Sequence, residues 1–265
     1  RDSEVETPVS FWCFFGFCRI YLREYSVNRV AMRKRVIRIA AVLLMIMGIA
    51  FAKVQKLETV QTDGSVSVVR LRVALTFDDG PSPKYTPLLL DGLKERNVHA
   101  TFFLLGKNIK KNQKLVQRMQ REGHLLGNHT YSHVQLDKIS ETTAKQEILR
   151  TNNEIYEAVG IYPEYMRPPY GAWKKNLELC VEMFPVFWDI DTLDWKSQNV
   201  EAILEAAGDR PEDGSIILMH DEYGTSVEAA FLLIDRLKKN GYEFVTVDKL
   251  ISDCAGGSMM VTVHR

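Results

Sequence analysis

Short apolar runs alternate with longer segments of helical periodicity in the second part of the chain. The runs that we interpret as strands span residues 73–77, 101–105, 186–189, 215–219 and 244–247, with shorter candidates near Leu125 and at residues 165–166. Apolar residues recur every three or four positions in residues 85–96, 107–122, 141–159 and 226–240, which predicts helices. Alternation of this kind is typical of a mostly parallel sheet covered by helices.

The number of strand signals narrows the fold further. About seven of them are too many for a minimal three-layer unit and one short of a closed eight-stranded barrel. We therefore predict an α/β fold, namely a distorted, incomplete (β/α) barrel with about seven parallel strands. Two helix boundaries also have local signals, because Ser140 is a good N-cap for a helix starting at Glu141 and Asn240-Gly241 is a good C-terminal stop.

The first part of the chain has the pattern of an export signal. Basic residues at 33–38 precede an apolar run at 39–52 that ends in Ala-Phe-Ala. The run is shorter than the roughly 20 residues that span a bilayer, which favours a cleaved signal peptide. An uncleaved anchor formed by residues 36–52 is the alternative, if the Arg38 side chain extends to the membrane surface. Either arrangement places the residues after 52 outside the cytoplasm.

These patterns divide the chain into five parts. We interpret residues 1–31 as an extension that is not part of the folded protein, because Met32 is a more natural start for a signal. Residues 32–52 are the signal peptide or signal anchor, and residues 53–70 form a polar linker. Residues 71–252 form the folded domain, and residues 253–265 a C-terminal tail.

Charge is unevenly distributed, although the formal net charge is zero. Residues 1–56 hold ten Lys/Arg and four Asp/Glu, which leaves 24 basic and 30 acidic residues in the remainder. A mildly acidic domain is a poor candidate for binding a phosphate backbone, so we expect no nucleic acid partner. The four cysteines have no metal-ligand spacing: Cys13, Cys18, Cys180 and Cys254. A disulfide between Cys180 and Cys254 stays open for an exported domain.

Two adjacent carboxylates follow the first predicted strand. Asp78 and Asp79 come directly after residues 73–77 and precede Gly80-Pro81, where the chain is expected to turn. Adjacent residues on a strand point to opposite faces, so both carboxylates can reach one site only if the turn begins at the pair itself.

A pair of histidines offers the complementary metal ligands. His129 and His133 have the i, i+4 spacing with which two imidazoles can bind one transition metal. One aspartate and two histidines form a three-ligand set that leaves a coordination position open, as in hydrolytic rather than structural metal sites.

Placement gives these motifs more weight than each has alone. Asp and Gly are common in ordinary turns, and Arg-Pro-Pro-Tyr-Gly at 167–171 could be only a rigid bend. However, the aspartate pair, Arg167, Asp191 with Asp194, and His220 each follow an apolar run. The carboxyl ends of parallel strands converge on one face, so we predict that these residues form one site.

The same residues carry a family resemblance. Thr-Phe-Asp-Asp-Gly-Pro at 76–81, His-Thr-x-x-His at 129–133, Arg-Pro-Pro-Tyr-Gly at 167–171, Asp-x-x-Asp-Trp at 191–195 and Leu-x-His at 218–220 occur in this order. This set resembles the motifs of the NodB-type polysaccharide deacetylases, carbohydrate esterase family four. The resemblance covers about residues 72–250 and makes 71–252 the deacetylase domain. It implies a distorted (β/α) barrel that removes acetyl groups from N-acetylated sugar polymers, or from xylan in one branch.

The resemblance also implies a role for each residue. A divalent metal, with zinc expected and cobalt as the alternative, would be held by Asp79, His129 and His133. The catalytic set would be Asp78 as general base, Arg167 as its partner, His220 as general acid and Asp191 as the carboxylate that orients His220. The substrate-binding set would be the Tyr170 backbone N–H in the oxyanion hole, with Trp195 and Leu218 as walls of the acetyl pocket.

Export and resemblance together lead to the functional hypothesis. We expect an extracytoplasmic, secreted or membrane-anchored enzyme that faces the cell wall and deacetylates N-acetylglucosamine or N-acetylmuramic acid units of peptidoglycan. Two alternatives stay open, an O-acetyl xylan esterase and a non-catalytic carbohydrate-binding relative, although the latter would need a damaged ligand set. A structural membrane protein would rest only on the apolar run at 39–52, and no protein partner is implied.

Overall fold

The computed structural model describes residues 61–62, 65–66, 71–173 and 183–256 of the chain. It divides into two units, Arg1–Val69 and Arg70–Arg265. In the first unit the structure describes one antiparallel pair, β1 (Gln61–Thr62) and β2 (Ser65–Val66), within the predicted linker. The predictions for residues 1–52 and for a Cys180–Cys254 disulfide lie outside the described residues. All further elements belong to the second unit.

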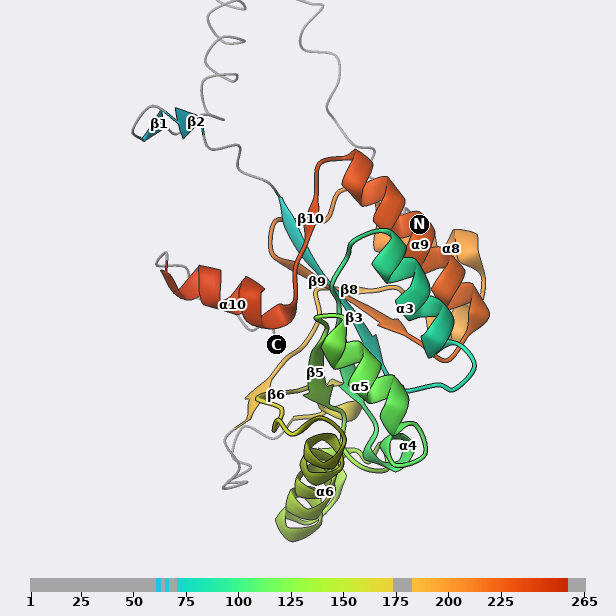
Figure 1. The fold of residues 1–265 in the computed structure, drawn as a ribbon, viewed down its shortest axis with the longest axis vertical. Helices are drawn as coiled ribbons and strands as arrows, with labels where there is room; N and C mark the ends of the chain where they lie inside the picture. Colours follow the sequence, from blue (N-terminus) through green and yellow to red (C-terminus); the bar gives the residue numbers. More distant parts are fainter. Residues whose placement is uncertain (1–60, 63–64, 67–70, 174–182, 257–265) are drawn as a thin grey trace, which may run out of the picture. The chain divides into compact units, whose positions relative to one another are not determined.

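A parallel sheet forms the centre of this second unit (Figure 1). Its strand order is β7-β6-β5-β4-β3-β9-β8, and β10 pairs with the start of β3. Within the described residues the eight strands are β3 (Arg72–Asp78), β4 (Thr101–Leu104), β5 (Leu125–Asn128), β6 (Tyr165–Met166), β7 (Phe184–Pro185), β8 (Ile190–Asp191), β9 (Ser215–His220) and β10 (Glu243–Phe244). In that part of the chain no ladder joins β7 to β8, so the predicted incomplete barrel is confirmed.

Helices cover the outside of the sheet. They are α3 (Thr86–Glu95), α4 (Gly106–Ile109), α5 (Gln113–Arg121), α6 (Glu141–Val159), α7 (Asp194–Ser197), α8 (Val200–Ala207), α9 (Gly224–Lys239) and α10 (Val247–Gly256), with 3-10 turns η2 (Leu136–Lys138) and η3 (Pro169–Gly171). Helices α3, α8 and α9 lie together on one side of the sheet, whereas α4, α5 and α6 cover the neighbouring strands (Figure 1). None of the helices in the described part of the chain has the length and hydropathy of a membrane span.

The helix predictions agree with the structure to different degrees. The helix predicted at 141–159 is α6, and its N-cap Ser140 accepts a hydrogen bond from the Thr143 backbone N–H at 3.2 Å. The prediction of one continuous helix at 107–122 is wrong, because the chain leaves the helix at Lys110–Asn112 and forms two shorter helices, α4 and α5. The short helices α7 and α8 were not predicted. Helix α10 was not predicted either, and it continues past the expected domain end at 252.

The strand predicted at 186–189 is wrong. Strand β7 ends before it and β8 begins after it, and these two strands lie at opposite ends of the sheet. The segment therefore crosses the open side of the barrel, and Arg167 donates hydrogen bonds to two of its carbonyls, those of Val186 (3.3 Å) and Phe187 (3.2 Å). The strand predicted at 244–247 is also shorter than expected, because Val247 already begins α10.

Strand β3 lies at the centre of the hydrophobic core. It pairs with β9 along Val73–Asp78 and with β4 along Thr76–Asp78. Leu75 and Phe77 are fully buried, and Phe77 stacks on Phe102 of β4 with ring centroids 5.4 Å apart. Burial on both faces holds the end of β3, and with it the Asp78–Asp79 pair, in a fixed position.

Candidate active site

The carboxyl ends of β3, β5, β6 and β9 bring the predicted residues together. Asp78, the last residue of β3, stands in register with His220, the last residue of β9. His129 directly follows β5, and Arg167 directly follows β6. The convergence expected at one edge of a parallel sheet is therefore present in the structure.

A left-handed turn directs Asp79 into the same site as Asp78. The backbone of Asp79 has φ +74°, a conformation that is uncommon for a residue other than glycine. Two hydrogen bonds hold this turn, one from Asn108 Nδ2 to the Asp79 carbonyl (2.9 Å) and one from the Leu105 N–H to the Gly80 carbonyl (3.0 Å). The chain thus turns at the aspartate pair, and both carboxylates face one point.

Asp79, His129 and His133 form a compact set of metal-ligating atoms. His129 Nε2 and His133 Nε2 each lie 3.5 Å from Asp79 Oδ1, and within the described part of the chain that buried oxygen has no hydrogen-bond partner. Two donors about 2.1 Å from a tetrahedral metal lie about 3.4 Å apart, so these distances fit a bound divalent ion. The orphaned oxygen is explained in the same way.

The opposite ring nitrogens of both histidines are held by other groups. His129 Nδ1 lies 2.6 Å from the Arg167 carbonyl oxygen, which accepts a hydrogen bond from the ring N–H, so Nε2 is left free to face the metal position. His133 Nδ1 lies 3.2 Å from the Tyr170 hydroxyl. Burial lowers the pKa of His129 to about 3, because a charged imidazole is poorly solvated there. His129 is therefore neutral at pH 7, as a ligand must be.

Asp78 is held by a buried arginine. Arg167 is fully buried, and its Nη1 donates to Asp78 Oδ1 at 2.9 Å and to Thr76 Oγ1 at 2.7 Å. The second carboxylate oxygen, Oδ2, lies 3.8 Å from His129 Nε2 and faces the metal position. Burial raises the pKa of Asp78, and the positive charge of Arg167 opposes this rise. A carboxylate with one oxygen fixed and the other free suits proton transfer.

The carboxylate that holds His220 is Asp194, not Asp191 as predicted. Asp194 Oδ1 accepts from His220 Nδ1 at 2.7 Å, and Oδ2 accepts from the His220 backbone N–H at 2.7 Å. Asp191 instead accepts the Leu193 N–H at 2.9 Å. In the sheet, Asp191 pairs with Leu218, two residues before His220, and a left-handed turn at Leu193 (φ +51°) then brings Asp194 to the histidine.

This ion pair controls the charge of His220. Burial alone would lower the pKa of His220, but the hydrogen bond and negative charge of Asp194 raise it to about 9. Burial opposes ionisation of Asp194 as well, yet the contacts with His220 and a hydrogen bond from Ser226 Oγ (2.6 Å) hold its pKa below the usual value. His220 is therefore positively charged at pH 7 and able to donate a proton.

The predicted substrate-binding residues lie around this centre. Tyr170 is 68% exposed, has φ +61°, and packs the edge of its ring against His133 with centroids 4.7 Å apart. Trp195, at the start of α7, is half exposed, and Leu218 is buried on β9 two residues before His220, hence on the same face of the strand. The roles of Trp195 and Leu218 as walls of the acetyl pocket, and of the Tyr170 backbone N–H in the oxyanion hole, stay predictions.

Three polar residues of the site were not identified from the sequence, namely Thr76, Asp194 in its role beside His220, and Ser226. Thr76 precedes Asp78 by two residues and therefore lies on the same face of β3. The alternation of side chains along a strand would have been enough to predict this position. Ser226 lies in α9, far along the chain from Asp194, and no local pattern connects the two.

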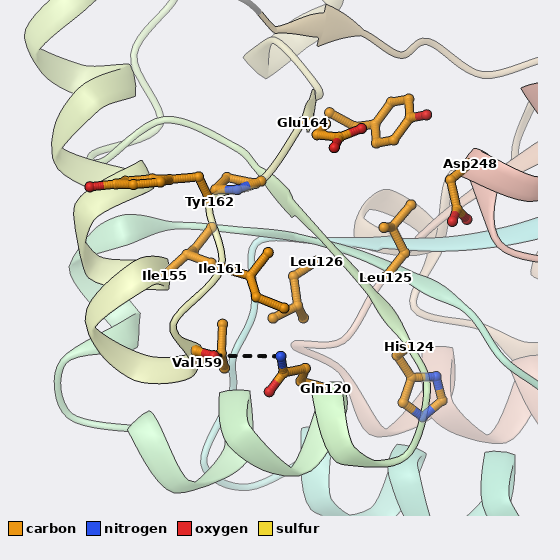
Figure 2. Close-up of a pocket in the computed structure, with 12 residues that line it drawn as sticks. Gln120, His124, Leu125, Leu126, Ile155, Val159, Ile161, Tyr162, Glu164 and Asp248 are labelled. Atoms are coloured by element: carbon orange, nitrogen blue, oxygen red, sulfur yellow. Dashed lines mark hydrogen bonds between the residues drawn. The ribbon is translucent and has the colours of Figure 1, made fainter.

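A separate hollow of about 230 Å³ lies away from this centre. Its lining includes His124 and Leu125 at the start of β5 and Glu164 just before β6, the opposite ends of the strands from the metal ligands. Figure 2 shows Ile155, Ile161 and Leu126 around its apolar part. The hollow contains none of the predicted site residues, so we do not assign the chemistry to it.

Comparison with known proteins agrees with the geometry. The sequence model of the polysaccharide deacetylase family matches residues 67–184. The peptidoglycan-N-acetylglucosamine deacetylase PgdA of Listeria monocytogenes is 42% identical over 182 residues, which are 69% of this chain and 39% of that protein. A peptidoglycan-N-acetylglucosamine deacetylase of Bacillus cereus is 41% identical over 188 residues, 68% of each chain.

A solved structure extends the likeness to three dimensions. The peptidoglycan deacetylase PdaC of Bacillus subtilis superposes with a TM-score of 0.68 at 38% identity, over 71% of this chain and 93% of that one. The chain spans about two-fifths of the length of the Listeria relative. The B. cereus relative, by contrast, is covered over two-thirds of its length at well above 30% identity. The chain therefore belongs to the polysaccharide deacetylase family.

Proposed function

We propose that this chain is a metal-dependent hydrolase that removes N-acetyl groups from amino-sugar units of peptidoglycan, N-acetylglucosamine or N-acetylmuramic acid. One observation carries the proposal. The ligand set of Asp79, His129 and His133 adjoins the Asp78–Arg167 pair, because His129 Nε2 lies 3.8 Å from Asp78 Oδ2. Asp78 in turn stands in register with His220, which is paired with Asp194. A base, an acid and a metal position at one point are what amide hydrolysis requires.

The metal would be held by the three ligand side chains, and we propose zinc, with cobalt as a substitute. Nitrogen and carboxylate ligands in a set of three suit Zn²⁺, which leaves a position for water and substrate. When bound, the metal supplies a Lewis acid that polarises the acetyl carbonyl and acidifies the attacking water.

Asp78 is the proposed general base. Arg167 fixes Oδ1, so Oδ2 is the oxygen available to take a proton from the attacking water. Burial raises the pKa of Asp78 despite the arginine, which makes the carboxylate a better proton acceptor than one in water. The water oxygen then bonds to the acetyl carbon, and the Tyr170 backbone N–H is the proposed donor to the resulting oxyanion.

His220 is the proposed general acid. Its Nδ1 is held by Asp194, so the opposite nitrogen, Nε2, is the atom that can donate to the leaving amine. Protonation of the amine nitrogen allows the carbon–nitrogen bond to break, which releases acetate and leaves a free amino group on the sugar. The pKa of about 9 ensures that His220 carries this proton at pH 7.

Two lines support peptidoglycan as the substrate. The named relatives act on peptidoglycan, and the basic and apolar pattern at residues 32–52 is that of a chain exported toward the cell wall. We accordingly propose an extracytoplasmic location, with the domain either secreted or anchored through residues 36–52. Substrate choice depends on loops around the site, of which residues 192–199 and 222–226 border His220.

The test combines one variant with a substrate comparison. Asp78→Asn should lose at least about 100-fold in deacetylation rate while it keeps one metal per chain, because Asp78 moves a proton and is not a ligand. Loss of the metal as well would mean that Asp78, rather than Asp79, is the ligand. Asp91→Asn is the matched control, since Asp91 forms a surface pair with Arg118 (2.6 Å) and should leave the rate unchanged.

Acetate release identifies the substrate class. We expect release from peptidoglycan and from N-acetylated chitooligosaccharides, with dependence on added zinc after chelation. Release from acetylated xylan alone would instead favour the esterase alternative. No release from any of the three by the metal-loaded protein would contradict the proposed function.

A further inference from the structure

Asp221, the residue after His220, has no part in the chemistry described above, yet it is one of the most deeply buried carboxylates of the domain. Its side chain is 0% exposed, and among the described residues its Oδ1 has no hydrogen-bond partner. A buried carboxylate oxygen without a partner is costly, so its retention calls for a physical reason.

The carboxyl group of Asp221 lies directly against the turn that carries the metal ligand Asp79. A Cβ atom placed on Gly80 would lie 2.4 Å from Asp221 Oδ1 and 2.6 Å from Oδ2. Only a residue without a side chain can therefore occupy position 80 while the carboxyl group keeps its place. Gly80, two residues after β3, and Asp221, directly after β9, therefore pack against each other at the carboxyl ends of these two paired strands.

Hydrogen bonds join Asp221 to the far side of the same turn. The Ser82 N–H donates to Thr86 Oγ1 at 2.7 Å, so the single proton of the Thr86 hydroxyl is free to go elsewhere. That hydroxyl donates it to Asp221 Oδ2, and Thr86 is fully buried like Asp221 itself. Asp221 thus holds the turn at two points. It packs against Gly80, and it is connected to Ser82 by two hydrogen bonds that meet at the Thr86 hydroxyl.

We propose that Asp221 is a positioning residue that fixes the turn of residues 79–82 relative to His220, and so sets the distance between the metal ligand and the general acid. The inference rests on the proposed function for the acid role of His220, but its effect on the metal does not. Asp221 acts through the backbone that it contacts and does not itself touch the ligand atoms.

Loss of the carboxyl group should loosen the metal site and the catalytic geometry together. In Asp221→Ala the Thr86 hydroxyl loses its acceptor and space opens beside Gly80. We expect the affinity for Zn²⁺, measured by competition with a chromophoric chelator, to fall about 10- to 100-fold. We expect kcat to fall by a similar factor with KM changed less than about threefold, because a displaced ligand alters the reacting geometry rather than the sugar contacts.

Two further variants separate positioning from simple destabilisation. Asp221→Asn keeps the shape and an oxygen acceptor for Thr86, so it should retain affinity and kcat within about threefold of the parent. Thr86→Val removes the hydroxyl but keeps the shape, and should reproduce the defect of Asp221→Ala. Because both act through one chain of hydrogen bonds, the double variant should be no worse than the more impaired single variant.

Each outcome decides the inference. Folded Asp221→Ala with parental zinc affinity and parental kcat would overturn it, and so would a folded Thr86→Val that behaves like the parent. If Asp221→Ala does not fold, Thr86→Val and Asp221→Asn decide in its place. If the parent binds zinc but releases no acetate, the proposed function fails. The visible spectrum and affinity of Co²⁺ in Asp221→Ala then test the positioning alone.

Discussion

Asp194 holds His220 in the charged form that its proposed role as an acid requires at neutral pH. Its two carboxylate oxygens accept both the ring N–H and the backbone N–H of His220, so it fixes the ring and its charge. Burial by itself lowers the pKa of this histidine, and the ion pair reverses the direction. We therefore expect the charge of this one buried carboxylate to control the pH range of the proposed reaction.

The kcat–pH profile of Asp194→Asn tests this control. An acid is active while protonated, so on the alkaline side of the profile the parent's kcat should fall as pH rises through about 9, the pKa of His220. Without the carboxylate, burial dominates and the pKa falls, which moves the alkaline decline to lower pH and removes most activity at pH 8. Asp191→Asn is the matched control, because Asp191 contacts the Leu193 N–H and should leave the decline in place. A shift in Asp191→Asn but not in Asp194→Asn would refute the assignment.

The sequence predicted residue types better than residue pairs. It identified the three side chains that lie together as a candidate metal-ligand set, because strand ends and short spacings indicate their positions. It chose Asp191 over Asp194 because the order of the motif does not reveal the left-handed backbone at Leu193 that turns the chain back toward β9. The period of apolar residues along the sequence carries no information on a single backbone angle, so it could not predict the pairing of Asp194 with His220.

Among the elements, α6 has the most complete local signals. Ser140 caps its first turn, and Gly160 ends it in the left-handed conformation with φ +76°. We expect Ser140→Ala to lower the free energy of unfolding by about 1 kcal/mol, because the Thr143 N–H loses its acceptor. Urea denaturation measures the change. Thr142→Ala, an exposed substitution within the same turn, is the control and should have an effect within about 0.5 kcal/mol.

Helices of this kind were predictable because their stabilising interactions are local in sequence. The two-residue strands β7 and β8 were not, because each is defined by one distant partner strand rather than by its own pattern. Residues 186–189 have the composition of a strand, but the guanidinium of Arg167 takes carbonyl groups that a neighbouring strand would otherwise bind. Tertiary contacts here override strand propensity.

At the scale of the whole molecule, alternating strands and helices were sufficient to predict the fold class and the face that carries the site. The way in which the barrel stays open was not predictable. It depends on β7 and β8, neighbours in sequence, pairing at opposite ends of the sheet. Arg167, directly after β6, contacts both the segment between β7 and β8, through the carbonyls of Val186 and Phe187, and the carboxylate of Asp78, so the open side of the barrel and the site share this arginine.

The folded domain keeps a preformed ligand set, which predicts that the metal stabilises the whole molecule. Asp79 Oδ1 is buried and has no hydrogen-bond partner among the residues that the structure describes, and His129 is already neutral at pH 7. Metal binding therefore satisfies this oxygen without displacing a proton from that histidine. Because the unfolded chain lacks this geometry, free zinc at 100 times its Kd should raise the free energy of unfolding by about 2.7 kcal/mol. Thermal unfolding of the chelated and zinc-loaded protein measures the increase. His133→Ala should abolish it, whereas His99→Ala, a half-buried histidine outside the ligand set, should retain it. An equal increase in His133→Ala would show that zinc stabilises the domain at another position.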